Sequence, residues 1–344
     1  FRGNALSQGV AAEPLPPPLK LLWRYRHKDG TFEGTPTIMG DRVFLGDMDE
    51  ALFCFELRTG KVVWKTKTEM GFVTAPAYRD GRLFLGDLDG IFRCYDSESG
   101  KELWHFETDA EIDSSASFHG DRVLFGSQDA TLYCLRRQDG KLVWRFPIAD
   151  QIRCMPTVVG NRAFVAGCDG VFHIVDVDKG EEVGSVPIDA PTGATPAVLG
   201  DYVYVGTEGG VFFAIDYKQA KEVWRFQDER SSLPFRASPA ACERAVVFAG
   251  HDKKVRAVDP ATGKLLWQFA AKSRLDASPV IAGSTVWAGT ARGRLVALDL
   301  RNGVHRWEYE CRGSLVGSPA VAKGVLVAAT DRGMVYALGK QENK

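Results

Sequence analysis

Short stretches of alternating apolar and polar residues recur through the whole chain and predict β-strands. The segment 71–104 is typical: 74–78, 82–86, 91–95 and 101–106 are extended runs. Turn residues such as Asp80-Gly81 and Ser99-Gly100 separate these runs. No window shows the 3.6-residue period of an amphipathic helix. The pattern therefore predicts an all-β protein.

The same strand frame repeats with a period near 40 residues, and tryptophan marks the repeat. The marked position reads Trp23, Trp64, Trp104, Trp144, Gly184, Trp224, Trp267 and Trp307. Four-stranded units of this length are typical of propeller blades, which bury their faces against their neighbours. The sequence predicts an eight-bladed β-propeller of four-stranded antiparallel blades.

The two ends of the chain predict how the ring closes. The eighth repeat stops at Gly339 without an outer strand, and residues 21–25 supply an unused one. We expect this amino-terminal strand to pair with the last blade, because an unpaired strand edge is a liability. Residues 1–20 are expected to form an extended, proline-rich leader outside the ring. Residues 21–339 are expected to form one propeller domain, and residues 340–344 a polar tail.

Composition and charge narrow the function classes. The 344 residues are 45% hydrophobic with a net charge of −1, so the whole molecule has no electrostatic footprint for nucleic acid. No apolar run is long enough to span a bilayer. The charge is uneven, however. Residues 1–184 have 22 Lys and Arg against 28 Asp and Glu, whereas residues 185–344 have 21 against 16.

The cysteines and histidines indicate packing, not chemistry. Cys54, Cys94 and Cys134 fall at one strand position where later repeats have alanine, so we expect small buried side chains. A disulfide among the other four cysteines stays open as an alternative. The six histidines show no metal-ligand spacing, and no P-loop or nucleophile motif is present.

The turn between the second and third strands changes its charge around the ring. Its third position reads Asp49, Asp89, Asp129, Asp169, Gly209, Lys253, Arg292 and Arg332. These turns are expected on the face that hosts binding, where they would form an acidic half and a basic half. The alternative is that an aspartate in a tight turn caps backbone amides. That alternative explains the four acids and leaves the three bases unexplained.

A second group of candidates is expected at the mouth of the central channel. It consists of Glu33, Asp113, Arg153, Arg236 and Asp276. Arg153 and Arg236 could form a basic notch that grips a carboxylate or phosphate, or could pair with Asp113 and Asp276. Nearby, the stretched connection 228–235 is expected to present Leu233 and Phe235 as anchors for a partner.

One repeat carries a recognisable motif. Residues 257–267 read A-V-D-P-A-T-G-K-L-L-W, which resembles the tryptophan-docking motif of pyrroloquinoline-quinone-type propeller repeats. Weaker copies extend the resemblance over about residues 21–339. Two departures are Gly184 in place of tryptophan and Gln219-Ala220 in place of Thr-Gly.

The resemblance implies two groups of relatives. One comprises the quinoprotein alcohol and glucose dehydrogenases, which are much longer. The other is the propeller lipoprotein of the outer-membrane barrel-assembly machinery, which is near this length and has no cofactor. The start Phe1-Arg2-Gly3-Asn4 also resembles the leader of secreted bacterial proteins of this class. This resemblance implies a periplasmic or other extracytoplasmic location.

We expect a non-catalytic, monomeric scaffold that binds a protein or peptide on its charge-polarised face, with no cofactor, in the bacterial envelope. Two alternatives stay open. A quinoprotein dehydrogenase would bind pyrroloquinoline quinone with calcium and use Asp113 or Asp276 as a base; a small anion or carbohydrate could bind at Arg153 and Arg236.

Overall fold

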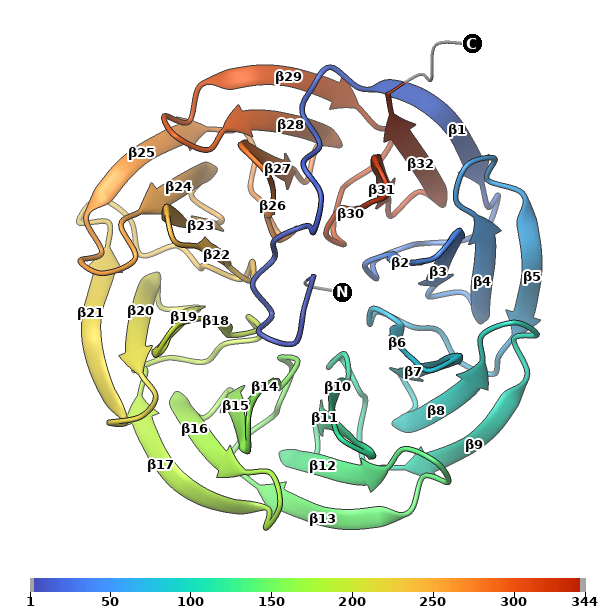
Figure 1. Cartoon of the computed structure of the whole chain (residues 1–344), viewed down its shortest axis with the longest axis horizontal. Helices are drawn as coiled ribbons and strands as arrows, with labels where there is room; N and C mark the ends of the chain where they lie inside the picture. Colours follow the sequence, from blue (N-terminus) through green and yellow to red (C-terminus); the bar gives the residue numbers. More distant parts are fainter. Residues whose placement is uncertain (1–2, 341–344) are drawn as a thin grey trace.

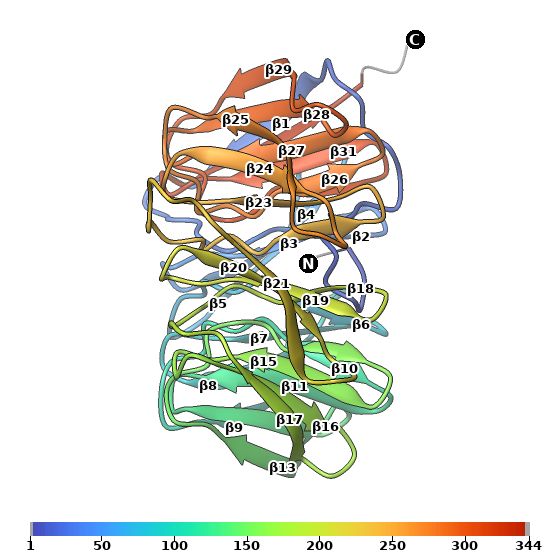
Figure 2. The same ribbon diagram turned by 90° about the vertical axis from the view of Figure 1, so that its left-hand side faces the viewer.

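The computed structural model describes residues 3–340 and confirms the eight-bladed propeller. The described part of the chain contains 32 β-strands in eight four-stranded antiparallel sheets. Figure 1 shows these sheets arranged radially as blades around a central channel, and Figure 2 shows that the ring is a flat disk. The expected polar tail 340–344 lies outside the described residues apart from Lys340.

Each blade runs from a short inner strand to an outer strand at the rim. The first four blades comprise β2 (Thr37–Met39), β3 (Arg42–Gly46), β4 (Ala51–Glu56) and β5 (Val62–Lys67); β6 (Ala77–Arg79), β7 (Arg82–Gly86), β8 (Ile91–Asp96) and β9 (Glu102–Glu107); β10 (Ser117–His119), β11 (Arg122–Ser127), β12 (Thr131–Arg136) and β13 (Leu142–Pro147); and β14 (Thr157–Val159), β15 (Arg162–Ala166), β16 (Val171–Asp176) and β17 (Glu181–Pro187).

The second half of the ring repeats this order. Its blades comprise β18 (Ala197–Leu199), β19 (Tyr202–Gly206), β20 (Val211–Asp216) and β21 (Lys221–Gln227); β22 (Ala240–Cys242), β23 (Ala245–Ala249), β24 (Lys254–Val258) and β25 (Leu265–Ala270); β26 (Val280–Ala282), β27 (Thr285–Gly289), β28 (Arg294–Asp299) and β29 (His305–Glu310); and β30 (Ala320–Ala322), β31 (Val325–Ala329) and β32 (Met334–Gly339), completed by β1 (Lys20–Arg26).

The amino-terminal strand closes the ring as predicted. β1 pairs antiparallel with β32, from Lys20 opposite Gly339 to Arg26 opposite Met334. The Trp23 side chain is 8% exposed and packs in the core between the last and first blades. The chain therefore joins its two ends through one sheet, and β32 has no free edge.

The repeated tryptophan is a contact between neighbouring blades. In six of the repeats the indole N–H donates to a carbonyl in the third turn of the next blade; Trp104 Nε1 to Arg137 O (3.3 Å) and Trp267 Nε1 to Leu300 O (2.9 Å) are examples. The ring lies over a glycine of that turn. At Gly140, with φ of +71°, a Cβ atom would stand 2.5 Å from Trp104 Cε3. Both the positive φ and the close approach therefore require glycine there.

The two departures from the motif meet at one interface. Gly184 on β17 occupies the tryptophan position, and Ala220 occupies the glycine position of the next blade. A Cβ at Gly184 would lie 3.1 Å from the Ala220 Cβ. Because no indole covers this turn, it can hold a methyl group, although Ala220 keeps the strained φ of +50°. The departures are thus a compensating pair.

This pairing predicts strong coupling between two substitutions. We expect Gly184→Trp alone to destabilise, because the indole meets the Ala220 methyl group. In the double variant Gly184→Trp/Ala220→Gly, the normal indole-on-glycine contact can form, with a coupling free energy of about 1–3 kcal/mol. Urea unfolding of the wild type, both single variants and the double variant measures it. Additive effects would contradict the compensation.

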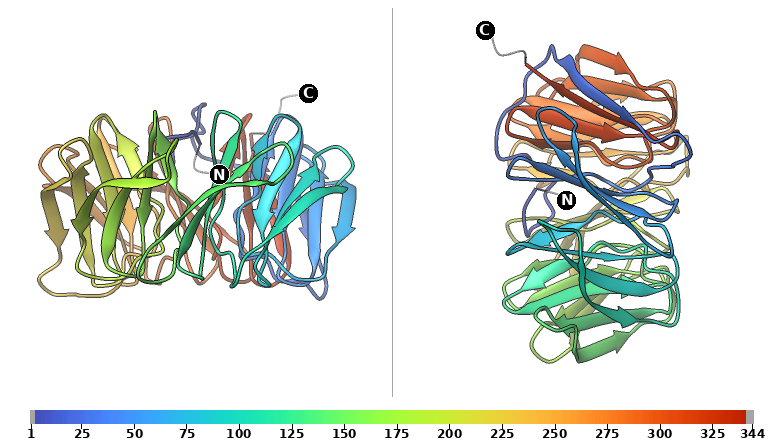
Figure 3. Two further views of the ribbon diagram at one scale, coloured as in Figure 1. Left: turned by 90° about the horizontal axis from the view of Figure 1, so that it is seen from below. Right: turned by 90° about the vertical axis from the view of Figure 1, so that its right-hand side faces the viewer.

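The two faces of the disk carry different turns. The turn between the second and third strands lies against the inter-blade connection, as the bond from Phe72 N to Asp47 O shows (2.7 Å). We call this side the connection face. The first and third turns share the opposite side, where Leu57 N donates to Asp41 O (2.9 Å). Figure 3 shows the disk from two edges.

The leader is extended, but it is not separate from the ring. It crosses from the rim into the central channel (Figure 1), and Leu15 and Leu19 are buried against the seventh and eighth blades. Pro14 lies against Gly283 in a first turn, on the side opposite the connection face. Its backbone also bonds to inner strands. The expectation of a leader outside the ring missed this docking, because the inner-strand edges that attract it are formed only by the fold.

The cysteines pack as the sequence predicts. Cys54, Cys94 and Cys134 are fully buried on the third strands of their blades, and burial raises the pKa of each thiol to about 12. All seven cysteines are free thiols in the structure, so none of the open disulfide alternatives is formed.

Candidate functional site

Most of the acidic turn residues on the connection face accept hydrogen bonds from backbone N–H groups. Asp49 Oδ2 accepts from Thr31 N (2.7 Å), and Asp129 Oδ2 accepts from Asp109 N (3.2 Å) and from the Tyr133 hydroxyl (2.7 Å). Asp169 accepts from Val171 N (3.1 Å) and contacts His173 Nε2 (2.9 Å). Asp89 is exposed, and its side chain makes no such bond to a residue in the described part of the chain. The capping interpretation therefore accounts for three of the four acids.

The basic turn residues are arranged differently. Lys253, Arg292 and Arg332 are exposed, and within residues 3–340 none of them forms a side-chain hydrogen bond or an ion pair. Their charges are therefore available to a partner. A capping role does not explain these three residues.

Two further bases extend this half of the face. Lys272 and Arg312 are exposed on the inter-blade connections, and Ala271 N bonds to Lys253 O (2.8 Å) while Cys311 N bonds to Gly293 O (2.8 Å). The backbone thus places each beside a basic turn. We call Lys253, Lys272, Arg292, Arg312 and Arg332 the basic arc. The sequence interpretation missed Lys272 and Arg312 because it compared only one position of each repeat.

The acids at the channel mouth are held in local pairs. Asp113 Oδ2 accepts from Gln128 Nε2 (2.7 Å), and Asp276 contacts His251 Nε2 (2.6 Å) and Arg274 Nε (3.1 Å). Burial, and then the charge of Glu111, raises the pKa of Asp113 above its usual range. Burial also raises the pKa of Glu33, with Asp331 and Asp276 adding to the effect.

The two mouth arginines form neither of the expected arrangements. Arg153 donates to Gln151 Oε1 through Nε (3.1 Å) and Nη2 (2.6 Å). Arg236 Nη2 donates to Glu208 Oε2 (2.9 Å). Each arginine therefore donates to a side chain close to it, and neither forms a bond across the mouth to Asp113 or Asp276. A shared basic notch is not preformed.

The stretched connection presents one of its two expected anchors. Leu233 is 50% exposed, but Phe235 is 2% exposed and packs against Phe248 with ring centroids 5.1 Å apart. Phe235 therefore cannot serve as a surface anchor. It occupies the inter-blade position that Phe72 and Ile152 occupy in other repeats, so the extra residues lie before it in the connection.

A buried ion cluster ties the same connection to the sixth blade. Arg256 is fully buried on β24, with Nη2 bonded to Asp228 Oδ2 (2.6 Å) and to Asp252 Oδ2. Lys254 Nζ also donates to Asp228 Oδ2 (2.9 Å). These bonds, with Lys254 contributing most, hold the pKa of Asp228 well below its usual range. The sequence signal was an arginine in a strand where most neighbouring residues are apolar.

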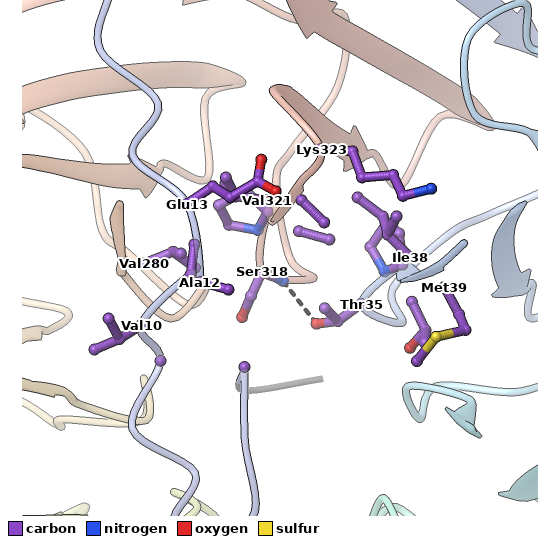
Figure 4. A pocket seen from close by; sticks show the side chains of 18 of the residues that line it. Val10, Ala12, Glu13, Thr35, Ile38, Met39, Val280, Ser318, Val321 and Lys323 are labelled. Atoms are coloured by element: carbon purple, nitrogen blue, oxygen red, sulfur yellow. Dashed lines mark hydrogen bonds between the residues drawn. The ribbon is translucent and has the colours of Figure 1, made fainter. Parts of the chain in front are cut away.

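The central channel contains a cavity of about 300 Å³ beside the leader. Figure 4 shows Val10, Ala12 and Glu13 of the leader on one side and Ile38, Val321 and Lys323 on the other. At its floor, Ser318 N donates to Thr35 Oγ1 (2.9 Å). The cavity is lined mainly by small apolar groups, with one carboxylate and one ammonium group at its margin.

The quinoprotein alternative would require carboxylates grouped for a calcium ion and a free carboxylate base. No group of three or more His, Cys, Asp or Glu side chains within residues 3–340 is arranged to hold a metal ion. Asp113 and Asp276, the nominated bases, are bonded to Gln128 and to His251 with Arg274.

The described residues also include no helix that could span a bilayer.

Comparison with solved structures shows the same fold in proteins of different function. BamB from Moraxella catarrhalis matches with 19% identity and a TM-score of 0.81 over 94% of this chain and 100% of that one. Quinohemoprotein alcohol dehydrogenase from Comamonas testosteroni matches with 15% identity and a TM-score of 0.83 over 100% and 81%. The computationally designed Ika8 protein matches with 18% identity and a TM-score of 0.82 over 92% and 98%. These likenesses show the fold alone.

A comparison with curated protein sequences gave no match. A family model does match, over residues 20–155, 89–183 and 150–344, which together span nearly the whole chain. That model describes the outer membrane protein assembly factor BamB. The chain therefore belongs to the BamB family of propeller proteins.

Proposed function

We propose that this protein is a non-catalytic scaffold that binds a protein partner through the connection face during outer-membrane assembly in the bacterial envelope. The basic arc meets an acidic surface of the partner, and Leu233 adds an apolar contact beside it. Membership of the BamB family supports a role in outer-membrane assembly, and the exposed basic arc with Leu233 supports binding of a partner through the connection face. Complementary charge of this kind raises the association rate and selects the partner.

The observation that carries the proposal is the contrast between the two sets of turns. Three of the four acids are used inside the protein, whereas Lys253, Arg292 and Arg332 are exposed without an ionic partner among residues 3–340. Three unpaired bases in neighbouring blades contribute nothing evident to folding. Three exposed bases on one side of the connection face favour binding of an anionic partner.

Charge reversal tests this proposal. We expect Lys253→Glu/Arg292→Glu/Arg332→Glu to lose most of the partner that the wild type captures from a native envelope fraction, because attraction becomes repulsion. The matched control is Arg244→Glu/Lys264→Glu/Arg301→Glu, which changes the charge equally at exposed positions on the first and third turns of the opposite face. Quantitative mass spectrometry of the captured proteins gives the ratio. Equal losses in both variants would contradict the proposal.

A further inference from the structure

The leader shows how the inner strands can bind an extended chain. The amide of Val198 on β18 donates to Leu6 O (2.9 Å), and that of Ala241 on β22 donates to Gln8 O (2.8 Å). On β26, Ile281 N donates to Gly9 O (2.9 Å) and Ile281 O accepts from Ala11 N (2.8 Å). Three consecutive blades thus use the channel edge of their inner strand to hold the leader.

Three other inner strands, β2, β6 and β30, present the same edge without a backbone partner among the described residues. Ile38, Tyr78 and Val321 occupy the middle of β2, β6 and β30, as Val198 does in β18. In an antiparallel ladder, residues of a non-hydrogen-bonded pair direct their N–H and C=O groups away from the neighbouring strand. Val198 is such a residue, because its N–H donates to Leu6 O, and the three middle residues occupy the equivalent register position. Among residues 3–340, no backbone group outside the blade's own sheet accepts from these three amides. All three residues line the cavity beside the leader.

The cavity also defines the chemistry of an occupant. Its volume is that of about ten water molecules. Most of its lining consists of glycine, alanine, valine and proline, with the larger Ile38, Met39 and Tyr78 beside them, which suits alanine- or valine-sized groups of an occupant. Lys323 is already paired with Asp41 (2.9 Å). Glu13 is exposed at the margin and has no ion pair within residues 3–340. A cation on the occupant would complement it.

We propose that the open side of the channel binds an extended peptide segment of a partner protein by strand addition to β30, β2 and β6. The segment has small apolar side chains and places a lysine or arginine beside Glu13. Main-chain hydrogen bonds to inner-strand edges supply the affinity, and the cavity selects side-chain size. This site goes beyond the proposed function and lies away from the basic arc.

A labelled peptide tests the site in the full-length protein. The probe is Leu-Ser-Gln-Gly-Val-Ala-Ala-Lys-Pro, a copy of residues 6–14 with lysine in place of glutamate, followed by fluorescence anisotropy. We expect Glu13→Lys to weaken its binding about fivefold or more and to favour instead the peptide that retains glutamate. The control, Glu243→Lys, changes an exposed acid that does not line the cavity and should bind as the wild type does.

Amide signals locate the bound peptide. In nuclear magnetic resonance spectra of the labelled protein, those of Ile38, Tyr78 and Val321 should shift on addition of the peptide, whereas those of Val198, Ala241 and Ile281 should not. Ala12→Trp fills the cavity from the exposed side of the leader and should abolish binding without lowering Tm. No binding to the wild type, or shifts confined to the strands that hold the leader, would overturn the proposal. Reversal of the basic arc should leave peptide binding unchanged, so this site and the proposed function can fail separately.

Discussion

Deletion of residues 1–26 is expected to lower Tm by at least about 10 °C or to abolish cooperative unfolding. The deletion removes β1 and leaves the edge of β32 unpaired. It also removes Trp23, Leu15 and Leu19 from the core. Loss of a buried tryptophan side chain alone costs about 3–5 kcal/mol, a large part of the 5–15 kcal/mol that stabilises a typical protein.

A shorter truncation separates ring closure from docking of the leader. Deletion of residues 1–9 removes the bonds to Val198 and Ala241 but keeps Leu15, Leu19 and β1. It should therefore lower Tm by only a few degrees. Differential scanning calorimetry of both truncations gives the comparison. If the two lose the same stability, closure through β1 is not what holds the ring together.

Arg256→Met is expected to destabilise the protein by about 3–5 kcal/mol at pH 7, because it leaves Asp252 and Asp228 without the buried guanidinium. Lys254 still bonds to Asp228, but it lies 3.8 Å from Asp252. Arg256 also lies over the rings of Phe226 and Phe235 (5.6 and 5.7 Å), so the variant also removes this support of the connection 228–235. Chemical denaturation measures the free energy.

The pH dependence identifies the cause. In the wild type, bonds from Lys254 and Arg256 hold the pKa of Asp228 below its unfolded value, so this contribution is present above about pH 4 and is lost as the pH falls. Without the bond from Arg256 the pKa of Asp228 should lie higher than in the wild type, so the deficit of the variant should shrink as the pH falls towards and below about 4. Arg294→Met, which removes a more exposed pair with Glu308, should cost less than about 1 kcal/mol. A deficit independent of pH would indicate lost packing.

The features that repeat were predictable from the sequence. The tryptophan, the turn glycine and the strand alternation each occur in several copies. Their period therefore predicts the four strands of a blade, the number of blades and the strand that closes the ring. The small residues at Cys54, Cys94 and Cys134 were understood in the same way. Each is a local pattern whose meaning depends on one blade and its neighbour.

The features that occur once were not predictable. The leader bonds to strands almost 200 to 270 residues away, and nothing in its own composition indicates an inner-strand edge as its partner. The sequence predicts an exposed Phe235, whereas the structure buries it, because the number of inserted residues does not show where in the connection they lie. Lys272 and Arg312 become part of the basic arc only when the fold places connections beside turns.

Charge at the connection face is the central claim, and the salt dependence of partner affinity tests it most directly. Isothermal titration of the captured partner at several salt concentrations would compare the wild type, the variant Lys253→Glu/Arg292→Glu/Arg332→Glu and the opposite-face control. We predict that Kd of the wild type and of the control rises steeply with salt, and that the variant binds weakly at low salt with little dependence. Equal affinity and equal salt dependence in all three proteins would contradict the claim.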